Sequence, residues 1–268
     1  MVGMSVDKAA DLFFYFFDII PPYTQQGNFE KTLGNLIQKV ENKNVNVSRG
    51  VKKGGVLPEL EESSSVYKNT SGFVIRDEKI PFIFLPDEIS PEEPFGRQIY
   101  TLIYLLVCIG LNQYDFYLEG NFKTSILKKE GLEALRHSIT TAILFPTEES
   151  EKLAKIHFDE EVIRQLAIKY KMTPTAILVT LMKRKVITLQ EFHRLSSNSN
   201  QYRKKASRGN RRRPLISTAV KKFCGNTATE YVNKGIRTGL LKSIEAQYLV
   251  FGRVSKSDYK RYYSQSGI

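Results

Sequence analysis

The chain has 268 residues, of which 41% are hydrophobic, and this composition excludes a protein without a packed core. Its formal net charge is +12, and the charge is unevenly placed. Residues 201–268 contain sixteen Lys and Arg against three acidic residues, whereas the first 200 residues contain twenty-four basic and twenty-five acidic residues. The C-terminal quarter therefore favours a polyanionic partner. The alternative is a solvated basic tail that only aids solubility.

The cysteines and the apolar runs indicate where the protein resides. Cys108 and Cys224 match no metal-binding or redox spacing, which is typical of a reducing compartment. The aromatic patch at 12–17 is predicted to be a core helix and not a signal peptide, because no small-residue cleavage site follows it. The most hydrophobic window, 96–111, is shorter than the roughly 20 residues that span a bilayer. We expect a cytoplasmic protein without a membrane partner.

The first third of the chain is predicted to mix helices with short strands. A helix is expected at 5–20, ended by Pro21 and Pro22, and another at 28–41. The alternation in 45–47 predicts a short edge strand, and the composition of 49–65 predicts a loop.

A hairpin and a buried helix are expected next. Strands at 72–76 and 80–85 are joined by a short polar connection, and Pro81 favours an edge position or a strand start. Ser90 to Glu93 has the form of a capping box. The window 96–111 then predicts a helix that is covered on all sides.

The middle of the chain is predicted to be helical. A helix is expected at 130–145, and another begins near Asp159. Thr173 is expected to cap the following helix, with Pro174 at its first position. Thr188-Leu189-Gln190-Glu191 forms a further capping box.

The helical pair at 160–185 resembles a helix-turn-helix in outline. A DNA-reading helix usually contacts bases from its N-terminal part, whereas this second helix has Lys183, Arg184 and Lys185 at its end. The pattern is therefore weak evidence for DNA binding, and a plain packing unit is the main interpretation.

A polar stretch at 196–214 is predicted to link the body, residues 1–195, to a helical C-terminal domain at 215–268. Its basic run has the pattern of a phosphate-binding or interaction segment. Tyr202 is the only aromatic residue beside the run, so base stacking is not indicated. Nucleic-acid binding, or docking of an acidic partner, is predicted to depend on seven residues: Arg203, Lys204, Lys205, Arg208, Arg211, Arg212 and Arg213.

Several stretches resemble the ImmA/IrrE family of zinc metallopeptidases. Arg97 to Cys108 aligns without a gap with the family stretch R-Q-R-F-T-L-A-H-E-L-G-H, which also follows a short β-hairpin. Glu133 to Pro146 is similar to the family helix E-x-E-A-N-x-F-A-x-x-L-L-M-P. Leu166 to Ile187 resembles the family's helical hairpin, and the part from Ser217 onward resembles the extension of longer members. The resemblance implies a mainly helical α+β, zincin-like metallopeptidase fold with a small β-sheet, plus a basic helical C-terminal domain.

The residues that the family's zinc site requires are absent. Tyr104, Leu105 and Cys108 stand where the family has two zinc-binding imidazoles and the Glu that acts as general base. The third ligand would fall at Glu133 or at Leu135. A Leu cannot activate water, and a Tyr–Cys pair is a poor zinc site. The resemblance therefore implies no catalytic residue, no metal and no cofactor.

A structural metal would need other ligands that the fold brings together. The candidates are Cys108, Glu130, Glu133 and His137. The favoured interpretation of His137 is an ordinary helix residue, and that of positions 104, 105 and 108 is core filling.

These patterns together predict a pseudo-peptidase that acts as a regulatory binding protein. By resemblance, its partner would be a repressor or another regulator of a phage, a mobile element or a stress response. Two alternatives remain. One is a DNA-binding transcriptional regulator that uses the degenerate domain as a scaffold, and the other is a metallopeptidase with an atypical site.

Overall fold

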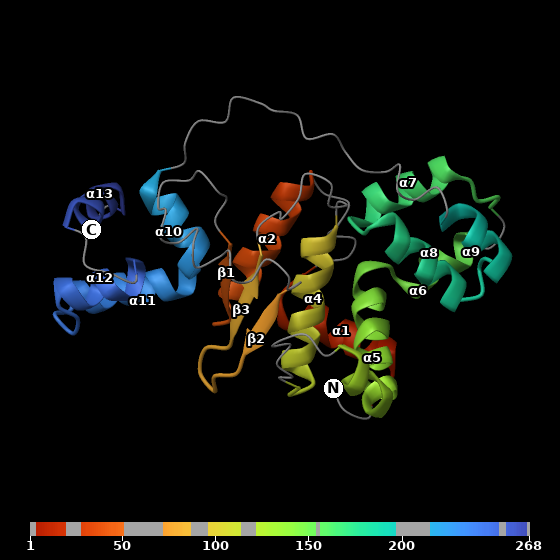
Figure 1. Ribbon diagram of the computed structural model, residues 1–268, viewed down its shortest axis with the longest axis horizontal. Helices are drawn as coiled ribbons and strands as arrows, with labels where there is room; N and C mark the ends of the chain where they lie inside the picture. The colour runs from red at the N-terminus through yellow and green to blue at the C-terminus, as the bar shows by residue number, and fades with distance from the viewer. Residues whose placement is uncertain are drawn as a thin grey trace. The chain divides into compact units, whose positions relative to one another are not determined.

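The computed structural model describes residues 4–19, 28–50, 72–86, 96–113, 122–153, 156–196, 215–251 and 256–266, with the backbone alone for 122–130 and 266. Over these residues the protein is mainly helical with one small sheet, which confirms the predicted α+β class (Figure 1). The chain forms two compact units. Unit 1 comprises Met1–Lys39 and Ser90–Ala206, and unit 2 comprises Val40–Ile89 and Ser207–Ile268. In this division the sheet and the C-terminal helices fall in one unit.

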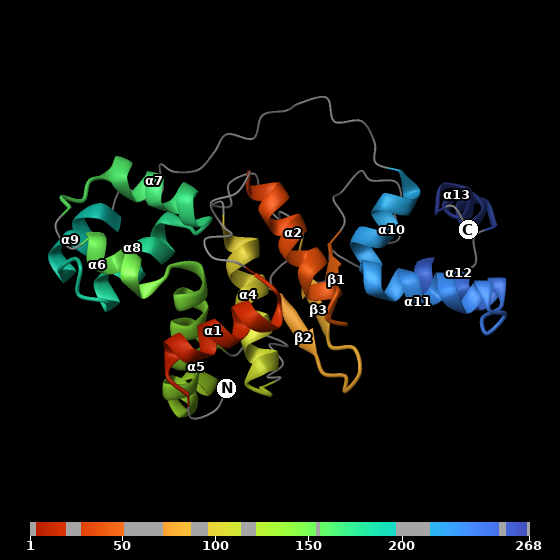
Figure 2. The same ribbon diagram turned by 180° about the vertical axis from the view of Figure 1, so that it is seen from behind.

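The first layer of unit 1 is built on a long helix, α5 (Phe122–Leu144). Helices α1 (Val6–Phe16) and α4 (Arg97–Gly110) both pack against α5 (Figure 2). Helix α5 begins eight residues before the predicted start. Helix α1 ends four residues before the predicted end, because Asp18 adopts a left-handed φ of 52° that a helix cannot continue.

The rest of unit 1 is a set of short helices. They are α6 (Thr147–Leu153), which the sequence patterns did not predict, α7 (Glu160–Tyr170), α8 (Pro174–Lys183) and α9 (Leu189–Ser196). Thr173 caps α8 by accepting a hydrogen bond from the Ala176 amide at 3.1 Å, as predicted. The capping box at the start of α9 is also confirmed, since Thr188 and Glu191 exchange backbone-to-side-chain hydrogen bonds.

Helix α2 (Phe29–Glu41) leads from unit 1 into the sheet of unit 2. The described strands are β1 (Asn46–Arg49), β2 (Phe73–Ile75) and β3 (Phe82–Leu85), in the order β1-β3-β2. Strand β2 pairs antiparallel with β3, which confirms the hairpin, and β1 pairs parallel with β3 at the predicted edge. Pro81 directly precedes β3, so it marks a strand start; the edge position is wrong, because β3 is central.

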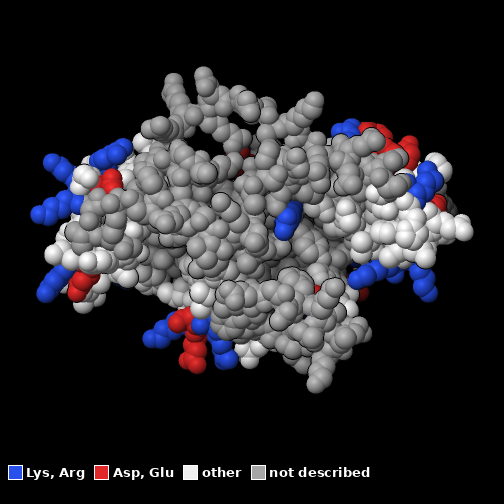
Figure 3. All heavy atoms as spheres, in the orientation of Figure 1, with Lys and Arg blue, Asp and Glu red and all other residues white. Residues whose placement is uncertain are grey.

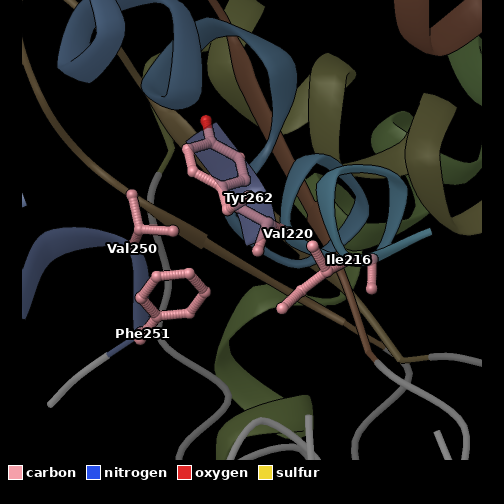
Figure 4. Close-up of a cluster of buried hydrophobic side chains, with 6 residues drawn as sticks. Ile216, Val220, Val250, Phe251 and Tyr262 are labelled. Carbon is pink, nitrogen blue, oxygen red and sulfur yellow. The ribbon is translucent and has the colours of Figure 1, made fainter. Parts of the chain in front are cut away.

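Four C-terminal helices complete unit 2: α10 (Ile216–Cys224), α11 (Asn226–Arg237), α12 (Ser243–Phe251) and α13 (Lys256–Ser266). Helices α10 and α11 pack on β1. The helices share their own apolar core, in which Val220, Val250 and Tyr262 are fully or almost fully buried (Figure 4). This core explains why the four helices hold together as one group.

Within the described part of the chain, no helix combines the length and the hydrophobicity needed to cross a bilayer. The loop expected at 49–65 and the capping box expected at Ser90–Glu93 lie almost entirely outside the described residues.

Candidate functional site

The candidate site lies where α4 faces α5 in unit 1. Tyr100 and Tyr104 are one helical turn apart on α4, so their side chains leave the same face of that helix. Both are half-buried, whereas eight other residues of α4 are buried. The expectation of a helix covered on all sides is therefore wrong along this face, and the two tyrosines form its partly open part.

His137 of α5 fills the space in front of these tyrosines. Its Nδ1 lies 2.7 Å from the hydroxyl of Tyr100, a distance that makes a hydrogen bond. The ring of Tyr104 packs against the imidazole with 4.8 Å between centroids. Tyr104, the position that the resemblance compares with a zinc-binding imidazole, therefore meets His137 by ring packing.

Glu133 completes the cluster one turn earlier on α5. Its Oε1 lies 3.8 Å from Nε2 of His137, which is within ion-pair range but longer than a hydrogen bond. Of the two positions considered for a third zinc ligand, the structure brings Glu133 beside the histidine. When Nδ1 of His137 accepts a hydrogen bond from the Tyr100 hydroxyl, the proton of the neutral imidazole is on Nε2, on the side of Glu133.

The electrostatics keep the Tyr100–His137 pair neutral at pH 7. Burial lowers the pKa of His137, and the negative charge of Glu133 opposes this shift only in part, while Lys183 and Arg136 add to it. Burial raises the pKa of Tyr100, against the effect of a hydrogen bond with Thr141. A protonated phenol and a neutral imidazole make a stable hydrogen-bonded pair, and neither group is poised to carry charge.

The other two α4 positions that the resemblance singles out lie in the core. Leu105 and Cys108 are each only 5% exposed. Gly96 sets the start of this helix, because it has a φ of +97° and a Cβ at this position would lie 2.5 Å from the carbonyl oxygen of Lys171. The sequence therefore fixes α4 closely against its neighbours in unit 1.

The donor set does not fit a zinc ion. The described residues contain no group of three or more His, Cys, Asp or Glu side chains that could hold a metal ion. Cys108 does not join Glu133 and His137 in such a group, and the side chain of Glu130 is outside the described part. His193 lies on α9, where its ring contacts Phe192. We therefore assign no chemical step to a metal.

The helix pair at 160–185 places its cations differently from a DNA-reading helix. Arg184 turns inward, where it donates hydrogen bonds to the carbonyl oxygens of Phe145 at 2.8 Å and Pro146 at 3.1 Å, and also contacts Ser150. Lys183 and Lys185 stay exposed. Arg184 is therefore a structural residue that closes the end of α5.

The basic run that was predicted to bind nucleic acid lies outside the described residues. This holds for all seven of its residues: Arg203, Lys204, Lys205, Arg208, Arg211, Arg212 and Arg213.

Tyr100 is the member of the cluster that sequence reasoning missed. The available signal was its position, four residues before Tyr104 on the face that meets α5. A second missed contact joins Arg136, which is 3% exposed, to Gln113, whose Oε1 accepts a hydrogen bond from Nε of Arg136 at 2.8 Å.

Comparisons of the chain with protein-family models, with curated proteins and with solved structures find no match.

Proposed function

We propose that this protein is a non-catalytic binding protein, built on a degenerate zinc-peptidase-like scaffold, that recognises a regulatory protein partner. The observation that carries the proposal is the Tyr100–His137 hydrogen bond with Tyr104 packed on the same imidazole. These contacts occupy the face where the resemblance expects a metal and its water. Leu105, at the position where the resemblance expects the general base, is apolar and buried.

The proposed partner class comes from the family resemblance. A repressor or another regulator of a mobile element or stress response is the expected target, and binding takes the place of cleavage. Fold-level analogy alone supports this identity. The filled α4–α5 face supports the non-catalytic part of the proposal, whichever partner is bound.

A restoration experiment tests the scaffold. The double variant Tyr104→His/Cys108→His puts two imidazoles one turn apart on α4, the first of them at the position that packs against His137. We expect this variant to bind zinc in a titration and to lose affinity when His137→Ala is added. A matched pair on an unrelated helix, Arg164→His/Ile168→His, supplies two imidazoles without those neighbours and should bind more weakly. Equal affinity of both pairs would contradict the scaffold.

A second candidate function, nucleic-acid binding, is favoured by the basic quarter, with sixteen basic against three acidic residues in 201–268. Replacing the seven residues of the basic run by Gln in the intact chain should reduce retention on DNA. The affinity of the intact chain should fall steeply with salt, because binding releases counterions from phosphates. Absence of retention at low salt would eliminate this function.

The charge-neutralised variant is a sharper tool than a truncation. A chain cut at residue 201 loses α10 and α11, which pack on β1, so it also disturbs the sheet of unit 2. The variant with seven Gln substitutions leaves these helices in place, and a change in its DNA binding then reports on the basic run alone.

A further inference from the structure

Helix α12 presents an apolar face to solvent. Its inner side is buried in the C-terminal core through Ala246, Val250 and Phe251. On the other side of α12, Ile244 is 59% exposed, Tyr248 57% and Leu249 59%, and Leu240, in the turn before the helix, is 81% exposed. We call these four residues the α12 stripe. Ile244 and Tyr248 are four residues apart on α12, which is the spacing of a helix face that binds a partner.

Three exposed cations lie close in sequence to the α12 stripe. Lys234 and Arg237 lie in the last turn of α11, Lys242 directly precedes α12, and all three are exposed. None of the three makes an ion pair with another residue in the described part of the chain. The acidic residue of α12, Glu245, is engaged locally, since its carboxylate accepts the backbone N–H of Lys242 at 2.6 Å. Blue side chains project around the C-terminal helices at the left of Figure 3, with some red side chains among them.

We propose that the α12 stripe is the docking surface for an acidic amphipathic helix of a partner protein. Its apolar side chains pack on Leu240, Ile244 and Tyr248, and its carboxylates face the cations beside the stripe. The proposal rests on the binding role proposed above, and it adds a location and a partner chemistry.

The charges and side chains argue against three other occupants. A second copy of the chain would bring two sets of like charges together. Nucleic acid would satisfy the cations, but it offers little for Leu240 and Ile244 to pack on. An anionic membrane would cover the whole exposed face and repel Glu245, whereas a single helix can lie along the stripe and leave that carboxylate in water.

Fluorescence anisotropy with a designed probe tests the proposal. The probe is a labelled synthetic helix that carries Leu along one face and Glu elsewhere, and its control has the same composition with the Leu residues scattered. We expect the intact protein to bind the probe, to bind the scattered control weakly, and to lose affinity with rising salt. The variant Ile244→Ser/Tyr248→Ser should bind the probe about tenfold more weakly or worse.

Matched variants separate the stripe from general surface effects. Ile168→Ser/Leu189→Ser removes two exposed apolar side chains from unit 1 and should leave probe affinity unchanged. Lys234→Gln/Arg237→Gln should weaken binding, whereas Lys8→Gln/Lys31→Gln, which removes two exposed cations from unit 1, should not. Because all these side chains are exposed, unfolding midpoints should stay close to that of the parent and verify that each variant folds.

The proposal is overturned if the intact chain does not bind the probe, or if the stripe variant or the scattered control binds equally well. It is also overturned if the stripe variant loses affinity for phosphatidylserine vesicles and keeps its affinity for the probe, which identifies a membrane surface. Loss of a concentration-dependent dimer in light scattering, with probe affinity unchanged, identifies a second copy. Zinc and hydrolysis assays on unit 1 do not involve α12, so failure of the stripe and failure of the proposed function are distinguishable.

Discussion

The side-chain oxygen of Asn46 accepts a hydrogen bond at 2.9 Å from the backbone N–H of Ala228, a residue 182 positions further along the chain. Asn46 belongs to β1, and Ala228 to the first turn of α11. The residue before α11 is Gly225, which has no side chain to cap that helix. Gly225 is required there, because a Cβ would lie 2.3 Å from Oδ1 of Asn46. A strand near the N-terminus thus supplies the cap of a C-terminal helix.

Asn46→Ala should destabilise unit 2 by about 1–2 kcal/mol, the usual effect of losing a helix cap. It also removes the bond from Nδ2 of Asn46 to the carbonyl oxygen of Cys224, at 2.8 Å. Amide hydrogen exchange should accelerate in the first turn of α11. Asn28→Ala, which removes the local cap of α2 at the Lys31 amide, should accelerate exchange in α2 instead. Unchanged exchange in α11 of the Asn46 variant would contradict this role.

Glu41 gives unit 2 a stability that depends on pH. Its carboxylate accepts the backbone N–H of Asn226 at 2.7 Å, but burial raises its pKa above the usual 4.5. The folded state therefore binds a proton more tightly than the unfolded state, and the contribution of this group to stability falls as pH rises from 4.5 through the folded pKa. Denaturant unfolding of unit 2 across this range should show the fall, and Glu41→Gln should flatten it. An equal slope in both proteins would disprove the assignment.

Glu149 has the opposite effect in unit 1. Hydrogen bonds from Lys152, Tyr170 and Lys169 lower its pKa to about 2. Since the folded pKa is below the unfolded value, the stabilisation is present above pH 4.5 and is lost as pH falls from 4.5 towards 2. Glu149→Gln should reduce this acid sensitivity, measured as the unfolding midpoint of unit 1 against pH. Glu148→Gln, on the same short helix, is the control and should behave like the parent.

Arg184 should matter for stability and not for DNA affinity. Its guanidinium satisfies two carbonyl oxygens at the end of α5, and charged hydrogen bonds of this kind contribute on the order of 1.5–3 kcal/mol. Arg184→Ala should therefore lower the free energy of unfolding by at least about 2 kcal/mol. Lys183→Ala, one residue earlier and exposed, should change it little. If Arg184→Ala keeps its stability and loses DNA binding, the helix pair reads DNA after all.

Local signals predicted most of the helices, because caps and apolar periodicity act within a few residues. Thr173 and the pair Thr188–Glu191 are examples in which the expected hydrogen bonds form. Alternation also predicted a short edge strand at 45–47, and the structure has β1 at Asn46–Arg49. In contrast, the grouping of β1 with α10 and α11 depends on Asn46 and Glu41 bonding to residues more than 170 positions away, and no periodicity reports such a contact.

Some features of the candidate site were also predictable from the sequence, and others were not. The positions Tyr104, Leu105 and Cys108 followed from the aligned motif, and the burial of the last two agrees with core filling. The partner of His137 did not follow, because a hydrogen bond between α4 and α5 depends on how the helices are rotated against each other. The exposure of Ile244 and Tyr248 was also not predictable, since apolar spacing alone does not distinguish a core face from a docking face.

The central claim is that the α4–α5 face is filled by side chains and holds no catalytic metal. Elemental analysis of the purified intact protein, run beside His137→Ala and Cys108→Ser, tests it most directly. The account predicts far less than one zinc per chain in all three proteins, and no hydrolysis of a casein substrate above background. One zinc per chain in the parent that disappears in either variant would contradict the account.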